Sequence, residues 1–165
     1  MNIGIIIIFH NNEEDIDTKV FAQQLDYANN IEFCLVNNAS KDNTYQLLKE
    51  IKDTRMTNVS IIDIKKFKSD VAAVRAGARY LSNQFTLKSI GYVSTNLINI
   101  KCNGLSGLIK SISENRKEII GCNIEALERQ ETKLTLFKSL FSVIDYLKKI
   151  KVENQFLNLQ YLSKF

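Results

Sequence analysis

The sequence predicts a three-layer α/β/α sandwich built around a mostly parallel sheet. Residues 3–9 form an apolar run that is mostly isoleucine, which is typical of a strand covered on both faces. Short apolar runs then alternate with stretches whose apolar residues recur at helical spacing. Strands that alternate with helices in this way indicate βαβ units and a parallel sheet. The chain has no proline, and no segment has the composition of a linker.

Strands and helices are expected in alternating order along the chain. The strands are expected at residues 3–9, 31–36, 59–64, 89–93 and about 118–124. The helices are expected at residues 16–28, 45–51, 71–81 and 105–112, and one long or two shorter helices from about residue 134. Ser40 is a candidate cap for the second helix, and Ser69 or Asp70 for the third.

Size and composition restrict the class of protein. A chain of 165 residues and 18.9 kDa suits a single domain over residues 1–165. Its net charge of +4 excludes an acidic tail protein and falls short of a dedicated nucleic-acid binder. No stretch approaches the ~20 apolar residues of a transmembrane span. The run at 3–9 lacks the length and the basic start of a signal peptide.

The cysteines and the histidine argue against metal cages and disulfides. Cys34, Cys102 and Cys122 are odd in number and none stands at C-x-x-C spacing, so neither a disulfide framework nor a zinc ribbon is expected. We expect His10, at the end of the first strand, to be a hydrogen-bonded structural residue rather than a ligand. Free thiols suit a reducing, cytoplasmic setting, with the inner face of the cell membrane as the alternative.

Polar residues follow four of the expected strands, and ligands of parallel sheets bind at that carboxyl edge. The segments are 10–14, 37–44, 65–68 and 94–96. Their amides, lysines and helix N-termini can hold a nucleotide. The alternative is that strand ends are polar simply because loops meet water, and the residues alone leave these two interpretations open.

Three motifs stand at Phe9–Glu14, Val36–Thr44 and Asp70–Gly77, and with them the chain resembles the family 2 glycosyltransferases. The family's P-x-Y-N-E-E-like turn corresponds to Phe9–Glu14, its V-D-D-G-S-x-D-x-T turn to Val36–Thr44, and its A-A-x-R-A-G helix motif to Asp70–Gly77. The order and spacing agree, and the match covers about residues 1–100. The resemblance implies the GT-A type of fold and a nucleotide or nucleotide-sugar ligand. It makes residues 1–100 the nucleotide-binding half and 101–165 a shortened acceptor half with C-terminal helices.

The resemblance also implies which residues meet the nucleotide. The candidates are Phe9, Asn11, Glu13, Asn37, Asn38, Ser40, Arg75, Ser94 and Asn96. Asn37 and Asn38 replace the family's acidic residues at the base, and an amide both donates and accepts where a carboxylate only accepts. Arg75 is a phosphate contact only by one of two alignments of the helix motif, and otherwise it pairs with Asp70 or lies along the surface.

The family's D-x-D metal motif is replaced here by Ser94, Thr95 and Asn96. Mg²⁺ and Mn²⁺ prefer carboxylate oxygens, so although the family typically uses such an ion we expect no metal ligands at this position. Lys65, Lys66 and Lys68 can in part supply the missing positive charge, but we expect them mainly to face solvent.

The general base is not identified. Inverting members of the family use a later carboxylate, which a short chain barely has room for. Glu125 and Glu128, with Glu131, are weak candidates, and the alternative is that they belong to an exposed helix start.

The C-terminal apolar residues offer a wide surface interleaved with lysines. Leu136, Phe141, Ile144 and Leu147 are among them. We expect core packing together with self-association, and a surface for anionic lipid or for a partner transferase is the alternative.

Two functions from different classes follow. One is a family 2-like glycosyltransferase that transfers a sugar to a cell-surface polysaccharide or lipid-linked acceptor. The other is a catalytically inactive GT-A domain that serves as a binding or assembly module, which the uncharged Ser94 and Asn96 favour. An unrelated Rossmann-like binder is a third interpretation, and the absence of G-x-G-x-x-G after the first strand argues against it.

Overall fold

The computed structural model describes residues 2–26, 29–54, 58–95, 104–130, 132 and 134–150. Within them, one sheet has the strand order β3-β2-β1-β4-β5, and every neighbouring pair is parallel. The strands are β1 (Ile3–Phe9), β2 (Ile31–Asn38), β3 (Val59–Ile64), β4 (Ser89–Ser94) and β5 (Phe141–Ser142). The predicted parallel α/β sheet is therefore confirmed.

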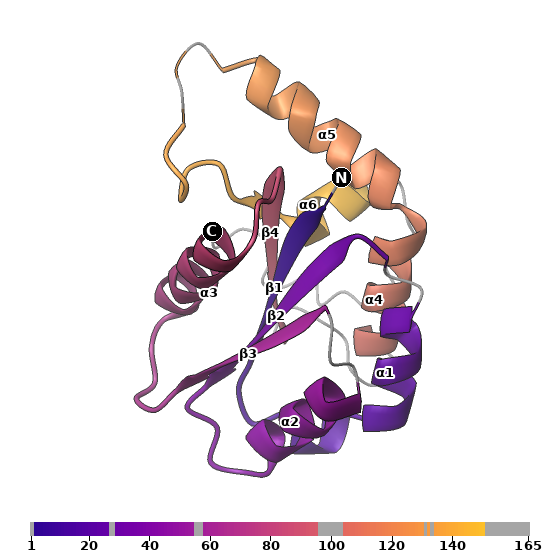
Figure 1. The fold of residues 1–165 in the computed structure, drawn as a ribbon, viewed down its shortest axis with the longest axis vertical. Coiled ribbons are helices and arrows are strands. Elements are labelled where there is room, and N and C mark those ends of the chain that lie inside the picture. Colours follow the sequence, from indigo (N-terminus) through magenta and orange to yellow (C-terminus); the bar gives the residue numbers. More distant parts are fainter. Residues whose placement is uncertain are drawn as a thin grey trace.

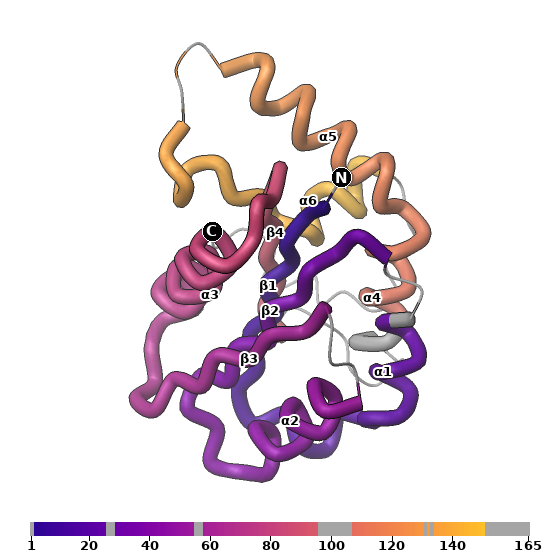
Figure 2. The backbone as a smooth tube through the Cα atoms, viewed as in Figure 1, coloured from indigo at the N-terminus to yellow at the C-terminus, as the bar shows by residue number. Residues whose placement is uncertain are grey.

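Helices cover both faces of this sheet, as Figures 1 and 2 show. The helix α3 (Asp70–Gln84) lies on one face. The other face carries α1 (Thr18–Asp26), α2 (Thr44–Thr54) and α4 (Gly104–Glu114). The helices α5 (Arg116–Glu128) and α6 (Val143–Lys149) complete this second layer, and a 3-10 turn, η1 (Glu13–Asp15), follows β1.

Alternation along β1 divides the core into two clusters. Ile3, Ile5 and Ile7 join the cluster beneath α1, α2 and α4, because successive strand residues point to opposite faces. Ile6 and Ile8 join the cluster beneath α3. All seven residues of β1 are buried, which explains why the run at 3–9 is continuously apolar.

The central helix α3 approaches the sheet closely at one glycine. A Cβ on Gly77 would stand 2.8 Å from a side-chain carbon of Ile6, closer than carbon atoms pack. Ser69 caps this helix, and its hydroxyl accepts from the N–H of Ala72 at 3.2 Å, as predicted. The absence of a Cβ at Gly77 therefore sets how close α3 lies to β1.

The predicted strand at 118–124 is wrong, because these residues belong to α5. Ile119 and Asn123 are four residues apart, and both are buried on the inner side of this helix. Nδ2 of Asn123 donates to the hydroxyl of Ser89, and Oδ1 accepts from Tyr146 at 3.1 Å. The buried polar contacts of Asn123 stabilise a helix where two adjacent isoleucines suggested a strand.

The predicted helical tail from 134 is only partly correct. Residues 134–140 are turn and coil, Phe141–Ser142 form β5 beside β4, and only Val143–Lys149 are helical. Phe141 stacks on Tyr146 with a centroid distance of 4.8 Å and 6° between the rings. Residues 151–165 lie outside the described residues.

The C-terminal apolar residues pack into the core as predicted. Phe141, Val143, Ile144 and Leu147 are buried beneath the second layer of helices. Leu136, Phe137 and Leu140 pack against the cluster beneath α3. Most of the apolar surface that suggested self-association is therefore packed inside the domain. Self-association stays a prediction.

The described cysteines are free thiols, and the described helices are short. Cys34 is buried, which raises the pKa of its thiol to about 12, and both Cys34 and Cys122 are free. Cys102 lies outside the described residues. Across the described part of the chain, none of the helices is both long and apolar enough to span a membrane.

Candidate functional site

The turns after β1 and β2 are bound to each other at the carboxyl edge of the sheet. The N–H of Asn11 donates to Oγ of Ser40 at 3.0 Å, and the N–H of Lys41 donates to Oδ1 of Asn11 at 2.8 Å. Nδ1 of His10 lies 2.7 Å from the carbonyl oxygen of Asn38, so His10 is hydrogen-bonded in the turn, as predicted. Hydrogen bonds therefore link the two turns to each other.

Asp42, rather than Ser40, accepts a hydrogen bond from the first N–H of α2. Oδ1 of Asp42 accepts from the N–H of Thr44 at 3.0 Å, and its other oxygen accepts from the N–H of Glu13 at 3.1 Å. The prediction that Ser40 caps this helix is wrong, because the helix begins at Thr44 and the hydroxyl of Ser40 is bound to Asn11. The carboxylate of Glu13 accepts from Nδ2 of Asn43 at 2.7 Å.

The end of β3 and the segment after it are bound to the same edge by Asn38 and Ala39, which follow each other at the end of β2. Nδ2 of Asn38 donates to the carbonyl oxygen of Lys68 at 2.7 Å, and the N–H of Lys68 returns a bond to Oδ1 of Asn38 at 3.0 Å. The N–H of Ala39 donates to the carbonyl oxygen of Ile64 at 2.9 Å. The end of β4 is connected as well, because the hydroxyl of Thr95 donates to Oδ1 of Asn12 at 2.9 Å. The turns expected to converge from separate parts of the sequence do so.

A cleft of about 650 Å³ opens among these turns, and we call it the β2–β3 cleft. It is lined by Asn37 and residues 39–42, by Tyr45 and Gln46 of α2, by residues 63–67 and by His10. Segments after β1, β2 and β3 thus contribute to one concave surface at the carboxyl edge, which is where a parallel sheet places its ligand.

The floor of the cleft carries a polar chain of three side chains. Asn37 and Asp63 stand at paired positions of β2 and β3, and Nδ2 of Asn37 donates to Oδ1 of Asp63 at 2.8 Å. Lys65 forms an ion pair with the other oxygen of Asp63. Partial burial favours a raised pKa for Asp63, but the hydrogen bonds from Lys65 and Asn37 and the Lys65 charge outweigh it, so the pKa lies below its usual value.

Among the atoms of Asn37, Asp63 and Lys65 that line the floor, Oδ1 of Asn37 has no hydrogen-bond partner. This oxygen is buried, in a residue that is only 3% exposed, and it accepts no hydrogen bond. An unpaired buried acceptor costs about 1–3 kcal/mol, so Asn37 leaves one hydrogen bond unmade beside the cleft.

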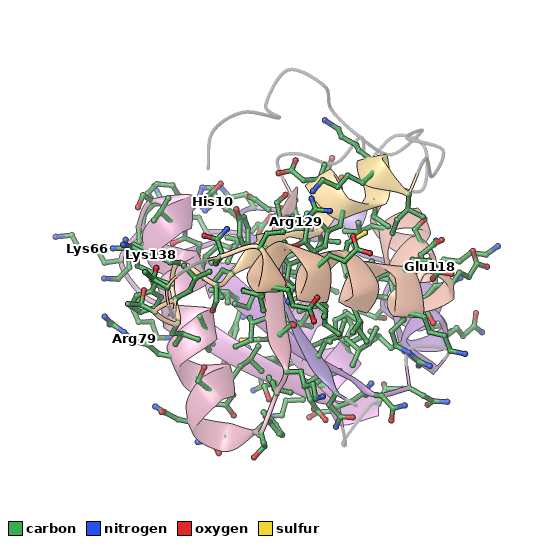
Figure 3. All side chains as sticks on the ribbon, turned by 90° about the horizontal axis from the view of Figure 1, so that it is seen from above. His10, Lys66, Arg79, Glu118, Arg129 and Lys138 are labelled. Carbon is green, nitrogen blue, oxygen red and sulfur yellow. The ribbon has the colours of Figure 1, made fainter. Side chains whose placement is uncertain are left out.

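Aromatic and basic side chains form the walls. The ring of Phe67 meets His10 edge-on at 4.8 Å between centroids, and Phe67 is 59% exposed. Nζ of Lys65 lies 5.6 Å from the centre of the Tyr45 ring. Lys66 projects from the side of the molecule on which α3 lies (Figure 3). Exposed rings and ammonium groups suit a flat base and a phosphate.

The predicted nucleotide-binding residues separate into three groups. Asn37 and Ser40 line the cleft. Phe9, Asn38 and Ser94 are buried and stabilise the edge from beneath, while Asn11 and Glu13 hold the turns together. Asn96 lies outside the described residues. The structure thus brings most of these residues to one edge but leaves few of them facing the cleft.

Arg75 is placed away from the cleft. Its guanidinium carbon lies 5.3 Å from the centre of the Phe137 ring, and that of Arg79 lies 5.2 Å from the same ring. The two arginines therefore hold residues 134–140 against α3, and Figure 3 shows Arg79 and Lys138 on this side of the molecule.

Glu125 and Glu128 lie on α5, at the opposite edge of the sheet. Asn123 of the same helix binds Ser89, the first residue of β4, and Figure 1 shows α5 beside the N-terminal ends of the strands. Both glutamates are exposed, and Glu125 pairs with Arg129 at 3.9 Å. The structure does not bring these carboxylates to the cleft, and Glu131 lies outside the described residues.

Sequence reasoning missed Asp63, Tyr45 and Gln46. Asp63 interrupts the apolar run of β3 one residue before the strand ends, and that interruption was the available signal. Its partner could not be read from the sequence, because the pairing depends on the register between β2 and β3.

Comparison with known proteins identifies the family. The sequence profile described as "Glycosyl transferase family 2" matches residues 4–88, which is just over half of the chain. The chain belongs to this family. The predicted family and its GT-A type of α/β fold are thereby confirmed.

Among solved structures, the crystal structure of S. aureus TarS 1–349 is similar, with 16% sequence identity and a TM-score of 0.46. The match covers 70% of this chain and 33% of the TarS chain, so the protein spans about a third of that structure's length. None of the curated proteins compared with the chain matches it.

The residues at the family's metal position do not fit a divalent ion. The hydroxyl of Thr95 is committed to Asn12, and Ser94 is 3% exposed and uncharged. Within the described ranges, no three His, Cys, Asp or Glu side chains stand close enough together to hold a metal. The donor set lacks the carboxylates that Mg²⁺ and Mn²⁺ require.

Proposed function

We propose that this domain binds the nucleotide part of a nucleotide-sugar in the β2–β3 cleft. The proposal rests on Oδ1 of Asn37, because this acceptor has no donor and its residue lines a cleft of suitable size. Oδ1 is closed to solvent in this arrangement, so binding requires a side chain of the cleft wall to turn aside.

A ring N–H is the donor that best suits this acceptor. Uracil presents such a donor at N3, and Tyr45 and Phe67 supply aromatic surface for the base. We therefore propose uridine as the nucleoside. Lys66, which also lines the cleft, supplies positive charge for the diphosphate in place of a cation.

Glycosyl transfer to a cell-surface polysaccharide or lipid-linked acceptor is the activity that the family suggests. We assign the acceptor half to residues 101–165. We also propose self-association, a cytoplasmic setting, and contact with a membrane or a partner transferase. The second candidate is an inactive binding or assembly module. The uncharged Ser94 and the distance of Glu125 and Glu128 from the cleft favour it.

Calorimetric titration with UDP, GDP and UDP-sugars, each with and without Mn²⁺, tests the proposal. We expect binding of UDP that Mn²⁺ leaves unchanged. If no nucleotide binds, the nucleotide site is wrong and the assembly module is favoured. If UDP binds but no UDP-sugar is hydrolysed or transferred, the domain is a binding module that kept its nucleotide site.

A further inference from the structure

Asp63 controls which way the amide of Asn37 points. The two side chains stand at paired positions of β2 and β3 and are joined by one hydrogen bond of 2.8 Å from Nδ2 to Oδ1. A carboxylate accepts and cannot donate, so the NH₂ group of Asn37 must face Asp63 and the oxygen must face away from it. The orientation of an otherwise ambiguous amide is thus fixed by its neighbour.

The charge on Asp63 secures this arrangement. Lys65 pairs with the second carboxylate oxygen, and Asp63 is 17% exposed. Burial works against the ionised form, but the Lys65 and Asn37 hydrogen bonds and the Lys65 charge hold the pKa of Asp63 below its usual value. Asp63 therefore stays ionised at neutral pH and cannot donate to Asn37.

We infer that Asp63 is a positioning residue that determines base specificity, by holding the Asn37 oxygen as an acceptor for a ring N–H. This inference rests on the proposed function. A base with N–H at the matching position, as in uracil, satisfies the free oxygen. Cytosine presents an unprotonated ring nitrogen there, which sets two acceptors against each other.

The chain differs here from a site built on a carboxylate. An aspartate at position 37 accepts in either orientation and needs no neighbour to fix it, whereas an asparagine selects a donor only while something holds its NH₂ group. If residue 63 becomes an amide, it can donate to Oδ1 of Asn37, and the Asn37 NH₂ group then turns toward the cleft.

The test compares the Kd of UMP with that of CMP, by calorimetry, in the wild type and in two variants. We expect wild type to bind UMP at least about tenfold more tightly than CMP, which is the loss expected when a buried acceptor meets no donor. In Asp63→Asn we expect the Kd ratio to fall by about tenfold. Asp63→Glu keeps an acceptor-only carboxylate and is expected to preserve the ratio.

The outcomes separate this inference from the proposed function. Binding of neither nucleotide to wild type overturns both. Wild type that binds UMP, with an unchanged Kd ratio in Asp63→Asn, overturns the role of Asp63 and leaves the nucleotide site standing. Wild type that prefers CMP overturns the inference without any variant. A general weakening of the fold would raise both Kd values together, so the ratio reports on the amide alone.

Discussion

Asn38 and Lys68 are joined by a reciprocal pair of hydrogen bonds, in which the buried Asn38 amide both donates to and accepts from the backbone of Lys68. An amide suits this pair because it carries both a donor and an acceptor, whereas the aspartate usual for the family only accepts. This contact explains in physical terms one departure from the family pattern.

Asn38→Asp is expected to lower the free energy of unfolding by about 1–3 kcal/mol, since the Lys68 carbonyl would lose its donor and face a carboxylate. Urea denaturation at neutral pH measures the change. Lys68→Ala is the matched control, because both bonds use only the backbone of Lys68, and it is expected to stay within about 0.5 kcal/mol of wild type. Equal losses in both variants would contradict the role of the Asn38 amide.

Ala39 adopts a left-handed backbone conformation, with φ of 53°, where the family pattern has glycine. This conformation costs a residue with a Cβ about 1–2 kcal/mol. Ala39→Gly is expected to raise the free energy of unfolding by about 0.5–1 kcal/mol after the added chain entropy of glycine is counted. The same replacement at helical Ala76 in α3 is the control and is expected to destabilise by about 1 kcal/mol. Destabilisation at both positions would show that Ala39 is unstrained.

The carboxylate of Asp42 makes stability depend on acid pH. Burial alone would raise the pKa of Asp42, but hydrogen bonds from Thr44 and from the Glu13 N–H hold the pKa below its usual value. A lowered folded-state pKa means that the stabilisation is fully present above the unfolded-state pKa and is lost as the pH falls through the folded-state pKa. Asp42→Asn is expected to cost about 1 kcal/mol at neutral pH.

Guanidinium denaturation at neutral pH and at about pH 3 checks this dependence. The difference in stability between wild type and Asp42→Asn should shrink at acid pH, because the unfolded wild-type chain then takes up a proton at Asp42 that the folded state binds less readily. Asp17→Asn is a control at an acid whose bonds lie within its own helix start. A difference that is the same at both pH values would refute the pKa assignment.

Gly91 leaves room for the last strand. A Cβ there would stand 2.5 Å and 2.6 Å from two ring carbons of Phe141 and 2.9 Å from Val143. Gly91→Ala is expected to lower the free energy of unfolding by about 1–3 kcal/mol through overpacking. Gly121→Ala in α5 meets nothing within 4 Å and is expected to stabilise by up to about 1 kcal/mol. Thermal melting followed by circular dichroism compares them, and a neutral Gly91→Ala would mean that β5 yields easily.

Carboxylates at the lost D-x-D position should restore metal dependence. The double variant Ser94→Asp with Asn96→Asp is expected to bind UDP more tightly with Mn²⁺ than without it, because two acidic oxygens supply the ligands that hard cations prefer. Calorimetry with and without EDTA measures this effect. Ser139→Asp, on a separate segment, is the charge control. An unchanged metal response would mean that residues 94–96 do not face the diphosphate.

Much of the fold followed from the sequence because strands buried on both faces carry an unmistakable pattern. The run at Ile3–Phe9 and the alternation after it were sufficient for the parallel sheet. The end of the chain was harder, since β5 has only two residues and gives no periodic signal. In α5, Ile119 and Ile120 suggested a strand, and the buried partners of Asn123 that stabilise a helix come from distant segments.

The sequence predicted which strand ends come together at the site, but not which side chains line the cleft. The topology alone brings the ends of parallel strands together, which is why the turns containing Asn11, Ser40 and Lys68 meet. Which side chains face the cleft depends on register and on local hydrogen bonding. Asn38 and Asn37 are adjacent in the sequence, yet one is committed to Lys68 and the other leaves an acceptor unpaired.

The strand order places the apolar β1 between β2 and β4, and both neighbours come later in the chain. As the polypeptide leaves the ribosome, an isoleucine-rich strand is therefore complete well before residues 89–94 exist to close its second edge. Such an open edge is a template for association between nascent chains. We therefore expect the native sheet to form slowly, because β1 can pair on both edges only after residues 89–94 have been made.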